Sequence, residues 1–411
     1  MNAVNELFLQ AVKAALRGEN TQFHRDLSQE EWQAFFSLAG MHRMLPLVYQ
    51  AVYGEPSLKK ENPAMVSAVR RQVWGQMMLQ TQKTSSFLEL NRILQDAGVK
   101  PLVVKGIICR NLYPQPDCRE SGDEDVLITE EQFDVCHQAM VSYGMASNGA
   151  REAYEVPYRK ADSPLYIELH KQLFPPESNA YGDLNRFFAG VHERAIPEEI
   201  QGCRVYTMDC TDHLFYLICH SFKHFLHSGF GIRQVCDIVL YAERYGEKVD
   251  WEQVLKNCRE IRADHFAAAI FEIGRNHLGF IPEKAAYPRI WREIAVDEGP
   301  MLEDLLTGGL YGDSQMARKH SSNITLSAVS AHKMGKKAEK SALTSVFPPA
   351  RNLEQRYPYL KNHPYLVPVA WCDRLWKYAW ETKEIKNNSA ADALKIGSKR
   401  VGLLKEYGII D

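Results

Sequence analysis

Two aspartates spaced two residues apart carry the clearest chemical signal in this 411-residue sequence. Asp123 and Asp125 stand at the head of the apolar run at residues 126–128, which predicts a β-strand. Side chains two apart on a strand point to the same face, so we expect the two carboxylates side by side, with Glu124 on the opposite face. Like charges this close repel, and a divalent cation such as Mg²⁺ (or Mn²⁺) relieves the repulsion because it prefers carboxylate oxygens. The pair therefore predicts a metal site.

A third carboxylate is available on a second predicted strand. At residues 166–170 polar and apolar side chains alternate, which places Tyr166, Glu168 and His170 on one face. If this strand lies beside the strand of the aspartate pair, Glu168 completes a three-carboxylate metal site. Asp162 is a rival third ligand, but it lies in the predicted hairpin turn before that strand, so Glu168 is the better candidate.

A phosphate-binding turn is predicted upstream, where the apolar strand at residues 102–104 meets Lys105 and Gly106. A glycine between a strand and a helix lets the backbone approach a phosphate closely, and the helix N-terminus offers N–H groups. Lys105 adds a positive charge. Metal ions and cations together are what phosphoryl and nucleotidyl transfer require, because charge on the phosphate must be neutralised during in-line attack.

A downstream helix carries a cluster of histidines. His220, His224 and His227 are spaced so that all three share one helix face. Imidazole suits Zn²⁺, which leaves a histidine-based metal hydrolase as one alternative; histidines that line the site or pack among aromatic neighbours are the simpler interpretation. On the next helix, Arg233 and Asp237 are four residues apart and predict a helical ion pair, with part of an acceptor pocket as the alternative.

Helices are expected to surround these segments. Residues 1–95 predict an N-terminal helical domain, with a capping box at residues 28–31. Residues 96–210 predict the core that carries the strands. Residues 211–345 return to a helical pattern, and residues 346–411 are expected to form a helical tail that packs on the bundle. The expected fold class is α+β, a small mixed sheet flanked by N-terminal and C-terminal helical domains.

Two later segments have an unusual composition. Residues 318–340 carry eight Lys, Arg or His side chains against one acid, in a segment expected to be a loop or a weak helix. A solvated basic surface is the main interpretation, and a lid over a triphosphate or an anionic acceptor is the alternative. Further on, Trp371, Trp376 and Trp380 belong to an amphipathic helix, for which packing on the bundle is a simpler interpretation than binding to a membrane surface.

The composition excludes several classes of protein. With 45% hydrophobic and 24% charged residues, the chain is expected to be a soluble globular protein with a substantial core. A net charge of −2 argues against a nucleic-acid partner. No signal-peptide pattern and no long apolar run are evident, so we expect no transmembrane segment and a cytoplasmic protein. The nine cysteines lack a Cys-x-x-Cys pair, which predicts reduced thiols.

The order of these motifs resembles a known family. A Lys-Gly turn and a helix are followed by Arg-x-Ser-Gly-Asp-x-Asp, an apolar run and an acidic residue on a later strand. This order is similar to that of the nucleotidyltransferase superfamily, which includes DNA polymerase beta and the antibiotic nucleotidyltransferases. More closely, it resembles the uncharacterised nucleotidyltransferases called nucleotidyltransferase family 5, whose N-terminal and C-terminal helical segments also resemble those of this chain.

The resemblance implies a set of site residues. The catalytic and metal-binding carboxylates, for Mg²⁺ (or Mn²⁺), would be Asp123, Asp125 and Glu168. The residues that hold the triphosphate would be Lys105, Gly106, Arg119 and Ser121. A His-x-x-Lys-His segment is also part of the resemblance, and it implies contacts to the nucleotide or acceptor from His220, Lys223 and His224.

The implied activity is transfer of a nucleoside monophosphate from a nucleoside triphosphate such as ATP, with release of pyrophosphate. The acceptor would be a hydroxyl or phosphate oxygen of a small molecule or a protein, and a nucleic-acid acceptor is not expected. Two alternatives keep the same fold. One is a non-catalytic protein that binds a nucleotide or a partner, and the other is an antitoxin-like enzyme that modifies a protein side chain.

Overall fold

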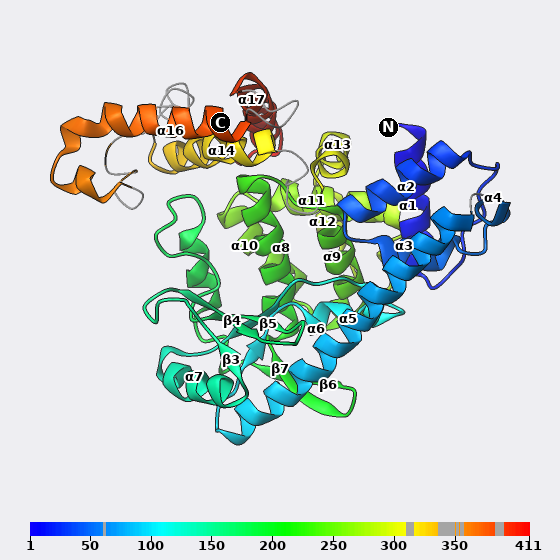
Figure 1. The fold of residues 1–411 in the computed structure, drawn as a ribbon, viewed down its shortest axis with the longest axis horizontal. Helices are drawn as coiled ribbons and strands as arrows, with labels where there is room; N and C mark the ends of the chain where they lie inside the picture. Colours follow the sequence, from blue (N-terminus) through cyan, green and yellow to red (C-terminus); the bar gives the residue numbers. More distant parts are fainter. Residues whose placement is uncertain (61–62, 310–315, 336–349, 351–352, 354–356, 383–389) are drawn as a thin grey trace.

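The computed structural model describes most of the chain (Figure 1). The described residues are 1–60, 63–309, 316–335, 350, 353, 357–382 and 390–411. The helices among them that are used below are α1 (Ala3–Leu16), α2 (Gln29–Met41), α3 (Leu45–Val52), α4 (Pro56–Lys60), α5 (Pro63–Asp96), α6 (Ile107–Arg110), α7 (Phe133–Ser142), α8 (Cys210–His227), α9 (Ile232–Tyr245), α10 (Trp251–Glu260), α11 (Asp264–Ile273), α12 (Arg289–Arg292), α13 (Gly299–Gly308), α14 (Met316–Lys333), α16 (Val367–Thr382) and α17 (Ala390–Glu406).

One mixed sheet organises the middle of the chain. Its strands lie in the spatial order β3-β4-β5-β2-β1-β7-β6. Their bounds are β1 (Leu102–Val103), β2 (Glu124–Leu127), β3 (Met145–Ala146), β4 (Glu155–Lys160), β5 (Tyr166–His170), β6 (Ile196–Ile200) and β7 (Cys203–Thr207). The pairs β2–β5 and β1–β7 are parallel, and the other pairs are antiparallel. The expected α+β class with a small mixed sheet is confirmed.

The two faces of the sheet pack on different helices. Val126 and Ile167 belong to one hydrophobic cluster with residues of α5 and α7. Leu102 and Leu127 point the other way and belong to a second cluster, which includes much of α8. Because side chains alternate along a strand, Asp125 and Glu168 lie on the α8 side of the sheet. Figure 1 shows α5 running from the N-terminal helices down to the sheet, with α8 and α9 rising from it.

The N-terminal helices form where the sequence predicted them. Ser28 caps α2 by accepting from the Glu31 N–H, while Glu31 accepts from the Ser28 N–H, so the predicted capping box is present. Trp32 and Phe35 of this helix are fully buried, and they belong to the same cluster as α8. The N-terminal helices and the helices after the sheet therefore share one hydrophobic core.

The basic segment is mainly a helix. Residues 316–333 form α14, where a loop or weak helix was expected. Arg318, expected on a solvated surface, is instead buried, where it pairs with Asp304 and donates to the Ser228 carbonyl oxygen at 2.7 Å. Lys336, Lys337 and Lys340, at the end of the predicted lid, lie outside the described residues.

The C-terminal tail packs on the bundle through α17. The Arg400 guanidinium donates to the carbonyl oxygens of Phe225 and His227 at the end of α8, and Leu404 is fully buried. Trp376 of α16 was expected to pack on the bundle, but it is 66% exposed. No helix of the described residues is both long and apolar enough to cross a membrane.

Candidate active site

Asp125 and Glu168 face each other across two neighbouring strands. The strands β2 and β5 are parallel, and their register pairs Asp125 directly with Glu168. Val126 and Ile167, the next residues on the opposite face, are buried at 1% and 0% exposure and fix which way the carboxylates point. The expectation that the Glu168 strand lies beside the Asp125 strand is confirmed. Asp162 lies exposed in a turn with φ 58°, as its predicted position implied.

His170 joins these two carboxylates. Potential ligand atoms of Asp125, Glu168 and His170 all lie within 4.8 Å of one another. Asp123 does not belong to this group, because it precedes the first residue of β2 and is only half-buried. Its negative charge nevertheless acts on Glu168 and helps to raise the pKa of that carboxyl. Its place among the metal ligands stays a prediction.

The two carboxyl groups have opposite electrostatic surroundings. Burial would raise the pKa of Asp125, but Lys105 and His170 hold it well below its ordinary value, and the Lys105 Nζ lies 2.8 Å from Asp125 Oδ2. For Glu168, burial and the negative charges of Asp125 and Asp123 raise the pKa to about 8. One member of the pair is therefore held ionised, while the other takes up and releases a proton near neutral pH.

Helix α8 places histidine side chains beside Lys105. His220 Nε2 lies 3.4 Å from Lys105 Nζ and 3.1 Å from His224 Nε2. Burial and the positive charge of Lys105 lower the pKa of His220 well below its ordinary value, so its ring is neutral. The pKa of Lys223 is also lowered, by burial and by Lys105, while the carboxylates of the sheet act to raise it. The structure thus brings the predicted His-x-x-Lys-His segment to the Lys105 side of the carboxylates.

His227 does not complete a three-histidine site. Its Nδ1 lies 3.4 Å from the Ser228 hydroxyl, at the end of α8. The metal-ligand group of the described residues contains none of the three α8 histidines. The geometry therefore gives no support to the histidine-based hydrolase.

The turn at Gly106 packs closely against Glu124. Its φ is +47°, and a Cβ at this position would stand 1.9 Å from Glu124 Oε2. That oxygen accepts the Ile107 N–H at 2.7 Å, at the start of α6. The first amide of α6 is therefore occupied by the Glu124 carboxylate, where phosphate was expected. Arg110 also pairs with Glu124 at 2.6 Å, so the close approach of Gly106 serves a buried ion pair.

Arg119 and Ser121 are buried, and both side chains form hydrogen bonds to other residues of the protein. The Arg119 Nε and Nη2 donate to the two oxygens of Asp237 at 2.8 and 2.6 Å, and Arg119 is only 2% exposed. Ser121 receives a bond from Arg110 and donates to Gln80 Oε1. Contact of either side chain with a triphosphate would require these buried bonds to break.

Asp237 is used differently from the sequence prediction. Both of its oxygens bind Arg119, and one also accepts the Tyr113 hydroxyl at 2.8 Å. Arg233, its expected helical partner, donates to the carbonyl oxygen of Glu120. Helix α9 therefore holds the loop that precedes Asp123 by two separate contacts.

Comparison with known proteins agrees with this geometry. Residues 28–279, more than half of the chain, match the family described as uncharacterised nucleotidyltransferase. The chain belongs to this family. The matched range begins at the residue that caps α2, ends shortly after α11, and contains every predicted site residue. No curated protein matches the chain, and no solved structure does.

Two buried residues of this nucleotidyltransferase domain were not predicted from the sequence. Lys83 of α5 is 3% exposed and donates to the carbonyl oxygens of Ser121 and Gly122, so it fixes the backbone just before Asp123. His213 of α8 is fully buried, and its Nε2 lies 2.8 Å from the carbonyl oxygen of Val104, next to Lys105. Burial lowers the pKa of His213 to about 4. A single polar residue in a helical pattern gave no signal for either role.

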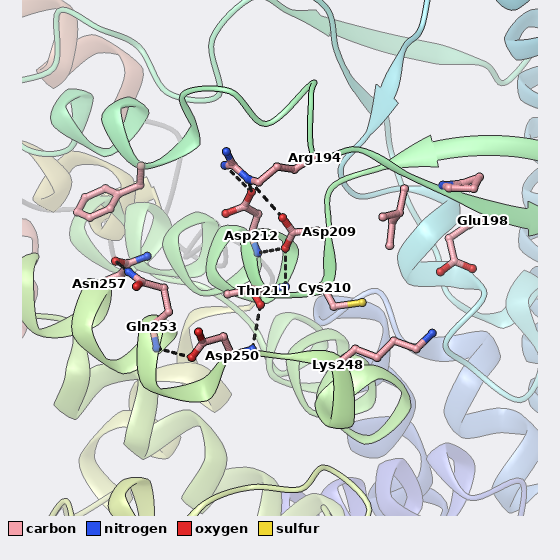
Figure 2. Close-up of a pocket in the computed structure, with 13 residues that line it drawn as sticks. Arg194, Glu198, Asp209, Cys210, Thr211, Asp212, Lys248, Asp250, Gln253 and Asn257 are labelled. Atoms are coloured by element: carbon pink, nitrogen blue, oxygen red, sulfur yellow. Dashed lines mark hydrogen bonds and ion pairs between the residues drawn. The ribbon is translucent and has the colours of Figure 1, made fainter.

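A cavity of about 880 Å³ lies elsewhere in the molecule. Figure 2 shows Asp209 and Asp212 at the start of α8, and Asp250 before α10. These carboxylates are already used: Asp209 and Asp250 accept backbone N–H groups at the two helix starts, and Arg194 pairs with Asp212 at 2.7 Å. None of the predicted site residues of the nucleotidyltransferase domain lines this cavity.

Proposed function

We propose that the protein is a metal-dependent nucleotidyltransferase that moves a nucleoside monophosphate from a nucleoside triphosphate to a hydroxyl or phosphate oxygen of an acceptor. The observation that carries the proposal is the direct pairing of Asp125 with Glu168 on neighbouring parallel strands, with Lys105 beside them. Membership in the nucleotidyltransferase family supports the same reaction class.

The residues present fit a divalent cation. Two carboxylates on one face of a sheet repel each other, and the raised pKa of Glu168 reflects that repulsion as well as burial. Asp125 and Glu168 would hold the ion, with Asp123 as a further predicted ligand. When bound, Mg²⁺ or Mn²⁺ neutralises charge on the triphosphate and lowers the pKa of the attacking oxygen.

The transfer step is assigned to residues of this chain as follows. The acceptor oxygen forms a bond to the α-phosphorus while the bond from that phosphorus to the β-phosphate oxygen breaks, and pyrophosphate leaves. Glu168, which would also ligate the cation, is assigned as the general base that takes the proton of the acceptor, because its carboxylate lies directly beside Asp125 at the proposed metal site. Lys105 keeps Asp125 ionised before the substrate binds.

The remaining predicted residues have supporting roles in this proposal. His220, Lys223 and His224 would contact the nucleotide or the acceptor from α8. Gly106, Arg119 and Ser121 would act as positioning residues, since their contacts fix the backbone on either side of the carboxylates.

Calorimetric titration of ATP, GTP, CTP and UTP, each with and without Mg²⁺, tests the site. We expect one triphosphate to bind in a metal-dependent manner to the wild type, and this binding to be lost in Asp125→Asn and Glu168→Gln. Asp162→Asn is the matched control, because Asp162 is an exposed carboxylate in a turn that asparagine also tolerates. Absence of binding to the wild type, or equal loss in the control, would overturn the proposal.

A second measurement separates catalysis from binding alone. The preferred triphosphate, labelled at its α-phosphate, is incubated with the protein and either a small-molecule extract or a protein extract. We expect pyrophosphate release and transfer of the label to one of the two fractions. Metal-dependent binding with neither release nor transfer would instead identify a non-catalytic nucleotide-binding protein.

A further inference from the structure

His170 is a buried side chain with carboxylates near both ring nitrogens but no well-aligned hydrogen bond to any of them. It is 5% exposed, and both ring nitrogens are buried without a hydrogen bond. A buried polar group of this kind is costly, and in folded proteins it almost always has a partner or binds an ion or a water. The transfer reaction proposed above gives this imidazole no role, so its burial beside the carboxylates needs another explanation.

The position of His170 follows from the strand that carries Glu168. The two residues lie two apart on β5, so they share the face that looks toward α8. His170 Nε2 lies 3.4 Å from Asp125 Oδ1 and 3.9 Å from Glu168 Oε2. Nε2 is therefore the ring nitrogen that lies near both carboxylates.

These distances suit ligands of one ion. Two atoms that each lie about 2.1 Å from a metal are separated by about 3.0 to 3.4 Å at octahedral or tetrahedral angles, and by about 4.2 Å when they lie opposite each other. The 3.4 Å separation from Asp125 suits adjacent ligands, whereas the 3.9 Å separation from Glu168 lies between the two values, so the Glu168 carboxyl would turn slightly to bind the same ion. Asp125 has its second oxygen, Oδ2, on Lys105, which leaves Oδ1 on the side of His170.

A third carboxylate, that of Glu155, lies near the other ring nitrogen of His170. Glu155 on β4 is paired with His170 in the sheet, and its Oε2 lies 3.8 Å from His170 Nδ1. When an ion occupies the Nε2 side, the proton must lie on Nδ1, and the nearby negative charge of Glu155 stabilises that tautomer. Glu155, His170 and the ion would then form the carboxylate–histidine–metal arrangement found in many metal sites.

We propose that His170 Nε2 is a metal ligand together with Asp125 and Glu168, and that the site therefore binds divalent transition-metal ions in preference to Mg²⁺. This inference rests on the proposed function and specifies its metal. Mg²⁺ prefers a shell of oxygen ligands, whereas imidazole favours first-row transition metals. Glu155 is a positioning residue for the imidazole.

Electron paramagnetic resonance of bound Mn²⁺ tests the ligand directly. The protein is prepared with and without ¹⁵N-labelled histidine, and the nuclear modulation of the Mn²⁺ signal reports whether a histidine nitrogen is bound. We expect a histidine coupling in the wild type that persists in His137→Gln and disappears in His170→Gln. His137 is a matched control because it is exposed on α7, on the other side of the sheet.

Affinities measured by titration provide the second readout. We expect His170→Gln to weaken Mn²⁺ binding at least tenfold while changing Mg²⁺ binding much less, so the preference for Mn²⁺ falls. Glu155→Gln covers the case in which His170→Gln fails to fold, because Glu155 is more exposed than His170; it should weaken Mn²⁺ binding by about tenfold or more and retain the histidine coupling.

Three outcomes would overturn the inference: a wild-type Mn²⁺ signal with oxygen ligands only, no Mn²⁺ binding, or a histidine coupling that survives in His170→Gln and is lost in His220→Gln. A different result tests the proposed function. If a triphosphate still binds with Mg²⁺ and depends on Asp125, the nucleotidyltransferase proposal stands and only the role of His170 is rejected.

Discussion

The chemistry of Glu168 depends strongly on its surroundings. Its carboxyl is mostly buried and faces two other acids, which together raise its pKa from 4.5 to about 8. Asp125, its neighbour across the strands, is stabilised as an anion by Lys105. Such divergent pKa values in adjacent groups are typical of functional sites, because each group is suited to a different task.

The pH dependence of stability should reveal this pKa in the metal-free protein. Between about pH 4.5 and 8 the unfolded chain releases the Glu168 proton while the folded protein keeps it, so rising pH favours unfolding. Glu168→Gln removes this effect and should increase the free energy of unfolding by about 1 kcal/mol or more at pH 8, with a smaller gain at pH 5.

Urea unfolding in the presence of a chelator, at both pH values, measures the difference. Asp162→Asn is the control and should stay within about 0.5 kcal/mol of the wild type, because its side chain is exposed. A stabilisation by Glu168→Gln that does not grow between pH 5 and pH 8 would contradict the raised pKa.

At the scale of elements, the junction between β1 and α6 positions Lys105. The Val104 N–H donates to the carbonyl oxygen of Asp125 at 3.1 Å, and the next turn passes directly over Glu124. Gly106 makes that approach possible because it has no Cβ and tolerates its positive φ.

Replacement of this glycine should be severe. Gly106→Ala places a methyl group on the Glu124 carboxylate, so we expect a loss of about 3 kcal/mol or more in the free energy of unfolding, together with loss of metal-dependent triphosphate binding. Gly75→Ala is the control: it lies inside α5 with no neighbour within 4 Å of the added carbon, and should be neutral or stabilising by up to about 1 kcal/mol. Chemical denaturation measures both free energies of unfolding. If Gly106→Ala and Gly75→Ala change it equally, the structure accommodates the added methyl group at Gly106 and the predicted clash with Glu124 is wrong.

The buried pair of Arg119 and Asp237 connects the loop before Asp123 to α9. Removing either partner leaves an unpaired buried charge, so Arg119→Gln and Asp237→Asn should each cost about 3–5 kcal/mol of stability. The double variant should lose much less than the sum.

The same pair of variants distinguishes a structural from a substrate-binding arginine. Triphosphate affinity, measured at a temperature where both variants are folded, should change equally in the two. If only Arg119→Gln loses affinity, Arg119 contacts the triphosphate itself and the assignment as a positioning residue is wrong.

At the scale of the whole molecule, the C-terminal helices support the helix that faces the site. Arg400 of α17 reaches the carbonyl oxygens at the end of α8, and α14 and α17 pack together beside it in Figure 1. Lys223 and His224 lie in the last turns of α8. Residues beyond the family match therefore stabilise part of the candidate site.

Arg400→Met should loosen this end of α8. Hydrogen exchange is expected to speed up in the last two turns of α8 and not only in α17, because the carbonyl groups that end a helix lose their donor. Lys399→Met is the control, since Lys399 is largely exposed and pairs with Glu303 on the surface. Faster exchange confined to α17 would mean that α8 holds its end without Arg400.

The sequence by itself determined the local features of this protein. Strand alternation placed Glu168 and His170 on one face, the capping box fixed the start of α2, and the Asp-x-Asp pattern marked the central strand. These features depend on residues within one or two turns of chain, where backbone geometry dictates which side chains share a face.

Only the tertiary structure decided which of these residues meet. The parallel pairing of β2 with β5 set Asp125 opposite Glu168 and brought in His170, while Asp123 stayed before the strand. Arg119 turned out to be bound to Asp237, more than a hundred residues away. Strand order and the burial of charged partners arise from packing between distant segments, and local sequence patterns contain no record of that packing.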